Sequence, residues 1–328
     1  MTKFSIRNNI IKPISSSGYG HELIYQAKKL MRKLPAPDYE FPQHLSLEIS
    51  SLCNLSCVHC PPQSEEFKEH HRDKSNMAIS LFDRVMDEID QYGKRHIALH
   101  KDGEPLLNPD IIYILNRVKK NQNHTVYLTT NAHRLIPEIA ESIIKNKIDV
   151  INFSIGAQSP EFYRKVRGRG FDRVMKNIHG FLNLVSKSER KPEILVQIIN
   201  LPEFEEMQNE IINFKKYWSV YNVSIQIWEK LNWGVYQTTK TRIKRYPCYS
   251  LWKYIFVNSD GKASACCMDW KQDLLLGDAN SQTLAEIWHD APIQHLRQKH
   301  IKGEEESLPI CNTCNYWSWL PKISEYHL

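Results

Sequence analysis

Three cysteines lie close together in the stretch SLCNLSCVHCPP, which spans residues 51–62. Cys53, Cys57 and Cys60 follow the spacing C-x3-C-x2-C, and thiolates are preferred ligands of iron–sulfur clusters. Three cysteines leave one iron of a cubane cluster without a protein ligand, so that a substrate or cofactor can bind there. Zinc is the alternative, with His59 as a fourth ligand, but four ligands within eight residues strain a tetrahedral site. The spacing therefore favours an iron–sulfur cluster.

The other five of the eight cysteines lie near the C-terminus, at Cys248, Cys266, Cys267, Cys311 and Cys314. Their spacing is C-x17-CC-x43-C-x2-C. Residues 251–270, which include the central pair, predict a β-hairpin with its turn around Gly261. A four-ligand zinc knuckle fits these residue types as well as an iron–sulfur cluster does. The residue types alone leave both kinds of site open here.

From about residue 44 to 230, short apolar, β-branched runs alternate with stretches of helical spacing, which indicates βα units and a parallel sheet. The six predicted strands are residues 45–50, 96–100, 125–130, 149–155, 193–199 and 224–229. Right-handed crossovers curl such units the same way, into an open doubly wound sheet or a partial barrel. Helices are predicted over 79–93, with Ser80 as N-cap and Gly93 near the end, and over 108–122.

The loops that follow the first four strands are rich in polar residues and ligands. The cysteine loop follows the first strand, KDGEP at 101–105 the second, Asn131 the third and GAQ at 156–158 the fourth. The carboxyl ends of parallel strands lie on one face of the sheet or barrel. We therefore expect these four loops to form one site.

Length and composition indicate a folded protein of two parts. The chain has 328 residues, of which 41% are apolar and 24% charged, and this length favours one large α/β domain plus a smaller unit. We expect residues 1–43 to form an N-terminal helix and arm, 44–230 the barrel, and 231–328 a cysteine-anchored unit.

The formal net charge of +6 is mildly basic, and the lysines and arginines alternate with acids, so neither nucleic acid nor membrane is an expected partner. The basic stretch KVRGRGFDRVMK at 165–176 is interpreted first as a solvated loop and helix face, although an anionic ligand group also fits it. We find neither a run of about 18 apolar residues nor a secretory signal. A cytoplasmic location is expected, where clustered cysteines more often bind metal than form disulfides.

Cys53, Cys57 and Cys60 after a first strand, in a chain of βα units, resemble the signature of the radical S-adenosylmethionine (SAM) superfamily. The resemblance implies a partial (β/α)6 TIM barrel and a [4Fe-4S] cluster whose open iron binds the amino and carboxylate groups of SAM. It also implies that one electron cleaves SAM to a 5'-deoxyadenosyl radical, and that a carrier such as flavodoxin or ferredoxin supplies this electron.

The second loop carries a further part of the resemblance. Gly103 and Glu104, in DGEP, resemble the family's glycine-glycine-glutamate loop, whose backbone meets the methionyl ammonium group. Glycine suits that task because it lets the backbone approach closely. Asp102 replaces the first glycine, which leaves the detailed shape of this loop open.

Other residues match cofactor contacts of the family. Ser154 resembles the serine near the ribose or carboxylate of SAM, and Arg167 the arginine that pairs with the carboxylate, with Arg169 as an alternative. Asn131 and Asn200 are weaker candidates for cofactor contact, because asparagine is also a common turn residue. His59 lies where the family usually has an aromatic residue facing the adenine.

The C-terminal stretches DGKASACCMDW, LLGDANSQTLAEIWHD and CNTC resemble the SPASM or twitch extensions of radical SAM enzymes, which hold auxiliary iron–sulfur clusters. A full SPASM domain carries seven cysteines for two clusters, so five cysteines imply one auxiliary [4Fe-4S] cluster and the shorter twitch arrangement. By similarity to aminocyclitol dehydrogenases, the implied ligands are Cys248, Cys266, Cys311 and Cys314. Cys267 is then free, although Cys266 and Cys267 could exchange roles.

A free Cys267 is either a small core residue or a donor of a hydrogen atom to a substrate radical, as in related aminoglycoside epimerases. The resemblance therefore implies a dehydrogenase or an epimerase acting on a sugar or aminocyclitol carbon. His100, Lys101 and Asp102 are candidate general bases beside the cofactor loop. Peptide maturation is a third possibility, but no winged-helix-like peptide-recognition domain is evident before residue 44. A zinc-stapled binding protein without catalysis is the alternative from a different class.

Overall fold

The computed structural model describes residues 9–11, 40–233, 247–314 and 316–318. The predicted N-terminal helix lies outside the described residues, whereas a short strand, β1 (Asn9–Ile11), is described. None of the described helices is long and apolar enough to cross a membrane.

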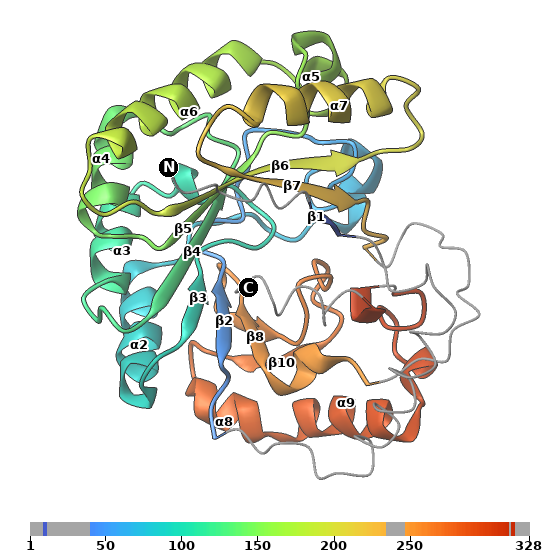
Figure 1. Cartoon of the computed structure of the whole chain (residues 1–328). Helices are drawn as coiled ribbons and strands as arrows, with labels where there is room; N and C mark the ends of the chain where they lie inside the picture. Colours follow the sequence, from blue (N-terminus) through green and yellow to red (C-terminus); the bar gives the residue numbers. More distant parts are fainter. Residues whose placement is uncertain (1–8, 12–39, 234–246, 315, 319–328) are drawn as a thin grey trace.

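Six parallel strands form the centre of the molecule (Figure 1). They are β2 (His44–Leu47), β3 (His96–Ala98), β4 (Thr125–Thr130), β5 (Val150–Ser154), β6 (Glu193–Asn200) and β7 (Ser224–Glu229). The strands lie side by side in chain order, and each neighbouring pair is parallel. The six strands expected from the alternating pattern are therefore confirmed.

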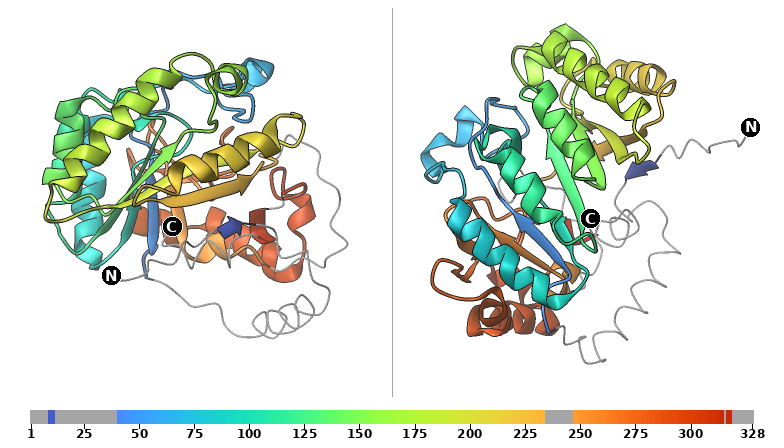
Figure 2. Two further views of the ribbon diagram at one scale, coloured as in Figure 1. Left: turned by 45° about the horizontal axis from the view of Figure 1, so that its top comes forward. Right: turned by 90° about the vertical axis from the view of Figure 1, so that its left-hand side faces the viewer.

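Helices cover the outer side of this sheet (Figures 1 and 2). They are α2 (Ile79–Ile89), α3 (Ile111–Val118), α4 (Pro137–Lys145), α5 (Pro160–Val166), α6 (Phe171–Ser186) and α7 (Met207–Trp218). Leu45 and Leu47 of β2 belong to the same apolar core as Phe82 and Val85 of α2. On the inner face of the sheet, Tyr127, Val150 and Leu195 form a second, small cluster. One curved sheet with a single helical layer is the predicted partial (β/α)6 barrel.

The expected cap of α2 is wrong. Ser80 lies inside the first turn, and the N-cap is Ala78, which has an extended backbone and makes no side-chain hydrogen bond. The helix starts at Ile79, one residue before Ser80. Its buried face begins with Leu81 and Phe82, and the packing of this face determines where the helix lies. Gly93 ends the segment after the short 3-10 helix η3 (Asp90–Tyr92), with a φ of 72°.

The cysteine-rich C-terminal part extends the same sheet. Its strands are β8 (Tyr254–Val257), β9 (Lys262–Ser264) and β10 (Leu275–Asp278), and β8 pairs in parallel with β2. The predicted hairpin is confirmed, since β8 and β9 are antiparallel and Gly261 turns between them with a φ of 90°. At the opposite edge, β1 pairs with β7, so the order is β1-β7-β6-β5-β4-β3-β2-β8-β9-β10. The sheet continues across the expected domain boundary at 230/231. The division of the chain into three domains therefore stays a prediction.

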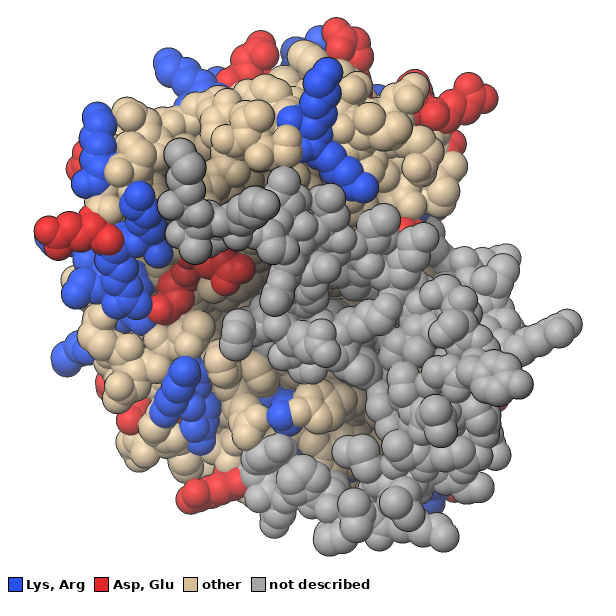
Figure 3. All heavy atoms as spheres, in the orientation of Figure 1, with Lys and Arg blue, Asp and Glu red and all other residues tan. Residues whose placement is uncertain are grey.

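Two helices pack beside the C-terminal strands, α8 (Leu284–His289) and α9 (Ala291–Lys302). The remaining short 3-10 helices are η2 (Glu65–His70), η4 (Pro105–Leu107), η5 (Tyr249–Trp252), η6 (Glu305–Ser307) and η7 (Tyr316–Ser318). On the face shown in Figure 3, basic side chains are interspersed with acidic ones. This mixture agrees with the alternating charges of the sequence.

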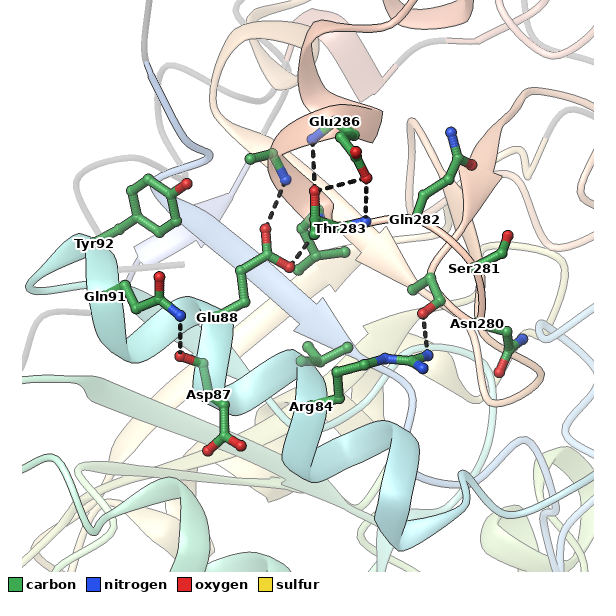
Figure 4. A pocket seen from close by; sticks show the side chains of 14 residues that line it. Arg84, Asp87, Glu88, Gln91, Tyr92, Asn280, Ser281, Gln282, Thr283 and Glu286 are labelled. Atoms are coloured by element: carbon green, nitrogen blue, oxygen red, sulfur yellow. Dashed lines mark hydrogen bonds between the residues drawn. The ribbon is translucent and has the colours of Figure 1, made fainter.

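A carboxylate of the barrel caps a helix of the C-terminal part. Glu88, on α2, accepts hydrogen bonds from the backbone N–H groups of Leu284 (2.7 Å) and Ala285 (2.8 Å), at the start of α8 (Figure 4). Nearby, Arg84 donates to the carbonyl oxygen of Ala279. These contacts lie in a groove of about 440 Å³ between α2 and residues 279–286. The two parts are therefore joined through side chains as well as through the sheet.

We predict that Glu88→Ala lowers the free energy of unfolding by roughly 1–2 kcal/mol, because two helix-terminal N–H groups lose their acceptor. The matched control is Glu141→Ala on α4, an exposed glutamate outside this groove, which should change stability by less than about 0.5 kcal/mol. Urea unfolding of the anaerobically prepared proteins measures both. Equal unfolding midpoints for the two variants would contradict the capping role.

Candidate functional site

The cysteine loop leaves β2 at the carboxyl end of the sheet. Cys57 is buried, and Cys53 and Cys60 are half-buried. Backbone hydrogen bonds fold the loop on itself, from Cys60 N–H to Cys57 O (3.0 Å) and from Gln63 N–H to Cys60 O (3.0 Å). Val58 N–H donates to Val166 O (3.1 Å), which fixes the loop against the end of α5. The loop is thus held by its own turns and by a neighbouring helix.

The three thiols lie close enough to affect one another's ionisation. Burial raises the pKa of Cys53 to about 11, with smaller contributions from Glu104 and Cys57. Burial also raises the pKa of Cys60, and the neighbouring thiols Cys57 and Cys53 raise it further. A bound cation lowers such values and converts thiols to thiolates. These three thiols would repel one another once ionised, and they therefore suit a positively charged metal centre.

The Gly103 loop packs directly on the cysteine loop. Glu104 N–H donates to Leu52 O (2.7 Å), and a Cβ atom added to Gly103 would lie 2.6 Å from the carbonyl carbon of Ser51. The Glu104 carboxylate is buried and accepts from Thr130 Oγ1 (2.6 Å) and Asn131 N (2.7 Å). Its side chain therefore joins the second and third loops, and only the backbone of this pair remains to contact a ligand.

Asp102 takes part in a buried ion-pair network that the sequence did not reveal. Its Oδ2 atom lies 2.7 Å from Lys101 Nζ and 3.0 Å from Arg72 Nη2, and Arg72 also donates to Glu48 (2.6 Å). Lys101 donates in addition to the carbonyl oxygen of Asp269 (3.1 Å), beyond β9. The signal in the sequence was Glu48, the charged residue in the predicted strand LSLEIS.

The three candidate general bases, His100, Lys101 and Asp102, differ in their surroundings and charge. Burial lowers the pKa of Lys101, but the carboxylates of Asp102 and Glu48 raise it above its usual value overall. The ammonium group therefore stays charged. His100 is different: its ring lies against Tyr127, with 5.4 Å between ring centroids, and burial lowers its pKa to about 4. His100 is therefore neutral near pH 7, whereas Lys101 and Asp102 are held in ion pairs.

Arg167 and Ser154 come together as expected. The guanidinium is buried and donates from Nη1 to Ser154 Oγ (3.2 Å), while its Nε has no hydrogen-bond partner among the described residues. A Cβ atom on Gly156 would lie 2.7 Å from Arg167 Cδ, so this glycine makes room for the arginine. Arg169 is exposed. The structure thus places Arg167, rather than Arg169, beside the cysteines.

Sequence reasoning missed the residues that hold Arg167. Tyr163, on α5, is buried and interacts with the Arg167 guanidinium through its hydroxyl. The Tyr163 hydroxyl lies 2.9 Å from His133 Nε2, in the third loop. The sequence contains no motif that indicates Tyr163 and His133, because the contact between them depends on how the third and fourth loops pack.

Asn131, Asn200 and His59 occupy different settings. Asn131 Nδ2 donates to Asn54 Oδ1 (2.9 Å) and lies 4.0 Å from Cys53 Sγ, which ties the third loop to the cysteine loop. Asn200 Nδ2 donates to Glu229 Oε2 (2.9 Å), and its Oδ1 has no partner in the described part of the chain. His59 is buried, and burial lowers its pKa to about 3, so its ring is neutral.

The C-terminal cysteines form a second group. Burial raises the pKa of Cys248, and the thiols of Cys266, Cys314 and Cys311 raise it further, which places these four together. Cys267 and Cys248 both raise the pKa of Tyr254 and of Tyr316, although burial is the main cause for both tyrosines. A hydrogen bond to Cys267 raises the pKa of Cys266. Backbone N–H groups of Met268 and Tyr316 donate to Cys266 Sγ (3.3 Å) and Cys314 Sγ (3.3 Å). Such bonds stabilise ligating thiolates.

Comparison with known proteins decides the family. The radical SAM superfamily matches residues 47–214, and an iron–sulfur cluster-binding domain, SPASM, matches residues 248–315. The chain belongs to the radical SAM superfamily. Both matches include the cysteine groups described above.

Curated relatives of this radical SAM chain match about half of it. The GTP 3',8-cyclase of Desulforamulus reducens is 29% identical over 164 residues, which cover 49% of this chain and 49% of that protein. A probable GTP 3',8-cyclase of Methanococcus aeolicus is 29% identical over 188 residues, which cover 49% of this chain and 60% of that protein. The chain thus spans about half the length of the curated relatives it matches.

Solved structures of other proteins share the fold over more of the chain. BtrN in complex with AdoMet and 2-DOIA has a TM-score of 0.57 at 15% identity, covering 83% of this chain and 92% of that one. Native anSMEcpe with bound AdoMet has a TM-score of 0.62 at 16% identity, covering 85% and 88%. Streptococcus suis SuiB bound to precursor peptide SuiA has a TM-score of 0.59 at 15% identity, covering 90% and 74%.

The radical SAM and SPASM domains indicate SAM, a [4Fe-4S] cluster and auxiliary cluster binding as the cofactors of this chain. The described residues fit them, because two groups of buried thiols are present and Arg167 Nε and His59 Nδ1 remain as buried, unpartnered atoms within the described site. The same residues include no group of three or more His, Cys, Asp or Glu side chains arranged around a single metal ion. The family favours iron–sulfur clusters over the zinc alternative.

We predict that Gly103→Ala lowers the free energy of unfolding by roughly 1–3 kcal/mol, because its Cβ would press on backbone atoms that cannot turn away. Gly180→Ala is the matched control, since this glycine lies within α6 and has no atom within 4 Å of an added Cβ. It should stabilise the chain by about 0.5–1 kcal/mol. Urea unfolding measures both, and a Gly103→Ala variant as stable as Gly180→Ala would refute the close packing of the two loops.

Proposed function

We propose that this radical SAM enzyme oxidises a hydroxyl-bearing carbon of a sugar or aminocyclitol. The observation that supports it most directly is the grouping of Cys53, Cys57, Cys60 and Arg167 at the carboxyl end of the sheet, with a second group of cysteines on the same sheet. The first group suits SAM activation and the second suits uptake of the electron that an oxidation releases.

In this proposal Cys53, Cys57 and Cys60 hold the SAM-binding cluster, and Cys248, Cys266, Cys311 and Cys314 hold one auxiliary cluster of the twitch type. When bound, SAM and its cluster would supply a 5'-deoxyadenosyl radical that takes a hydrogen atom from the substrate. The auxiliary cluster would accept one electron. The choice of Cys266 over Cys267 is supported by the thiols that surround Cys248. Four cysteines leave no open position on the auxiliary cluster for substrate.

The remaining residues orient SAM. Arg167 pairs with its carboxylate, because the buried guanidinium keeps its Nε free of other partners in the described site. The Gly103 backbone would contact the methionyl ammonium group, Ser154 supports Arg167, and His59 would offer a neutral ring to the adenine. Asn131 acts through the cysteine loop that it braces.

Asn200 and His100 complete the assignment. Asn200, at the end of β6, offers its unpartnered Oδ1 to the cofactor. His100 is the proton acceptor for the substrate hydroxyl, since Lys101 and Asp102 are held in buried ion pairs. His100 lies on the inner side of β3 next to Tyr127, within the barrel.

Two observations bear on other net reactions. Cys267 is free in this assignment, and an epimerase would use it as a hydrogen-atom donor; its setting beside Tyr254 and Tyr316 favours a packed residue instead. The similarity to GTP 3',8-cyclases supports a second candidate, a purine nucleotide substrate. Structures with 2-DOIA and with a precursor peptide share the fold equally well, so the fold does not choose between small molecules and peptides.

We predict that Tyr163→Phe weakens SAM binding by roughly threefold to tenfold, the equivalent of about 1 kcal/mol for one lost hydrogen bond. The variant keeps the buried ring but frees Arg167 from the hydroxyl that holds it. Equilibrium binding of SAM to reconstituted, unreduced enzyme measures the effect. Tyr113→Phe, which removes an exposed hydroxyl bound to Asp83, is the matched control and should bind SAM normally. Normal binding by both variants would exclude this role of Tyr163.

A substrate panel of sugars, aminocyclitols and GTP in deuterated water tests the net reaction. We predict a ketone product from a sugar or aminocyclitol, no solvent deuterium on the reacting carbon, and unchanged product formation by Cys267→Ala. If the wild type installs deuterium and Cys267→Ala stalls, the enzyme is an epimerase. Turnover of GTP alone would replace the proposal with the nucleotide candidate. A Cys53→Ser variant should cleave no SAM and serves as the control.

A further inference from the structure

A group of exposed cations lies around the fourth loop of the barrel. It includes the basic stretch 165–176, of which Lys165 pairs with Glu206 (2.8 Å). The basic rim is defined here as the exposed residues Arg134, Arg164, Arg169, Arg173 and Lys176. Within the described residues, no ion pair involves any of these five side chains. These five cations are therefore not held in ion pairs in the described part of the chain, although the exposed acids Glu161 and Asp172 lie on the same helices.

The basic rim borders the cysteine loop. Val58 N–H donates to Val166 O (3.1 Å), directly before the turn that leads from α5 to α6. From α6, Asn177 Nδ2 donates to Ala132 O (2.8 Å), and Asn131 in turn donates to Asn54 (2.9 Å). Figure 2 shows the blue segment after β2 beside the green helix α5. Elements α5, α6 and the third loop, which carry these cations, thus pack together beside the cysteine loop.

The cysteine loop itself reaches the surface between these cations. Asn54, Ser56 and Val58, which alternate with the cysteines, are exposed, and Val58 has 36% of its surface accessible. Between these exposed residues, Cys57 is buried and Cys53 and Cys60 are half-buried. Only the thickness of this loop therefore separates the predicted cluster from solvent. An electron arriving here does not need to cross the barrel.

We propose that the basic rim is the docking surface of an acidic one-electron carrier protein that reduces the SAM-binding cluster. Complementary charge steers such partners and raises association rates by one to three orders of magnitude at low salt. In each event the carrier loses one electron and the cluster gains one, with no bond made or broken. The inference rests on the proposed assignment of Cys53, Cys57 and Cys60, and it gives a role to exposed cations around Arg167 that the proposed SAM site does not use.

The test compares two triple charge reversals. Arg134→Glu, Arg164→Glu and Arg173→Glu remove cations from three elements of the rim, whereas the control, Lys145→Glu, Lys187→Glu and Lys191→Glu, makes the same change in charge at the opposite, amino end of the sheet. Anaerobic stopped-flow absorbance follows bleaching of the clusters in the holoenzyme. The reductants are reduced flavodoxin, reduced ferredoxin and dithionite, at about 0.05 and 0.5 M salt.

We expect the rim variant to be reduced by one or both carriers roughly tenfold more slowly than wild type or control at low salt, and to lose most of the salt dependence. Its reduction by dithionite, a small molecule that needs no docking surface, should be unchanged. Carrier rates equal to those of the control variant would overturn the proposal, as would an equal loss with dithionite. Binding of an oligonucleotide that the rim variant loses, with carrier rates intact, would assign the rim to nucleic acid.

Cluster reduction is measured before any substrate is added, so this result does not depend on the net reaction. An incorrect substrate assignment would appear separately, as dithionite-reduced enzyme that cleaves SAM but leaves sugars and aminocyclitols unchanged. Loss of rapid bleaching in Cys53→Ser, with slow bleaching retained, identifies which phase belongs to the SAM-binding cluster.

Discussion

The site depends on one buried carboxylate, that of Glu48 at the end of β2. Its oxygens accept from Arg72 (2.6 and 2.7 Å), from Asp102 N–H (3.2 Å) and from Ser259 N–H (3.0 Å). An ionised carboxylate without such partners would be very costly inside a protein. The partners come from three separate segments: the stretch before α2, the Gly103 loop and the β8–β9 hairpin. Folding therefore has to bring all three against the cysteine loop before this charge is stabilised.

The same constraint explains why the side chains of Asp102 and Glu104 serve structure and leave the backbone for a ligand. Glu104 accepts hydrogen bonds from Thr130, Asn131 and Leu106, and Asp102 pairs through Oδ2 with Lys101 and Arg72. The replacement of a glycine by Asp102 fits this network, because its carboxylate meets two cations. In the proposed site, the backbone around Gly103 remains for SAM at this loop, where a side chain would collide with Ser51 and Leu52.

The sequence predicted those features that repeat or that are local. The six strands and the hairpin at Gly261 follow from short-range patterns, and the meeting of the cysteine, Gly103 and Asn131 loops follows from the parallel sheet. Features that join distant segments were not predictable in this way. The pairing of β2 with β8, the contact of Tyr163 with His133 and the ion pairs of Arg72 depend on which surfaces meet in the folded chain. The cap at Ser80 failed because a suitable residue type does not fix where a helix begins.

The two ends of the sheet have a further consequence for the behaviour of the chain. A sheet of six parallel strands has two edges with unpaired N–H and C=O groups, and such edges can recruit strands of other molecules. Here β1 covers β7 and the β8–β9–β10 ribbon covers β2. The C-terminal cysteine unit therefore also shields the strand that leads into the cysteine loop. A fragment that ends after β7 would expose β2 and become prone to self-association, whatever its metal content.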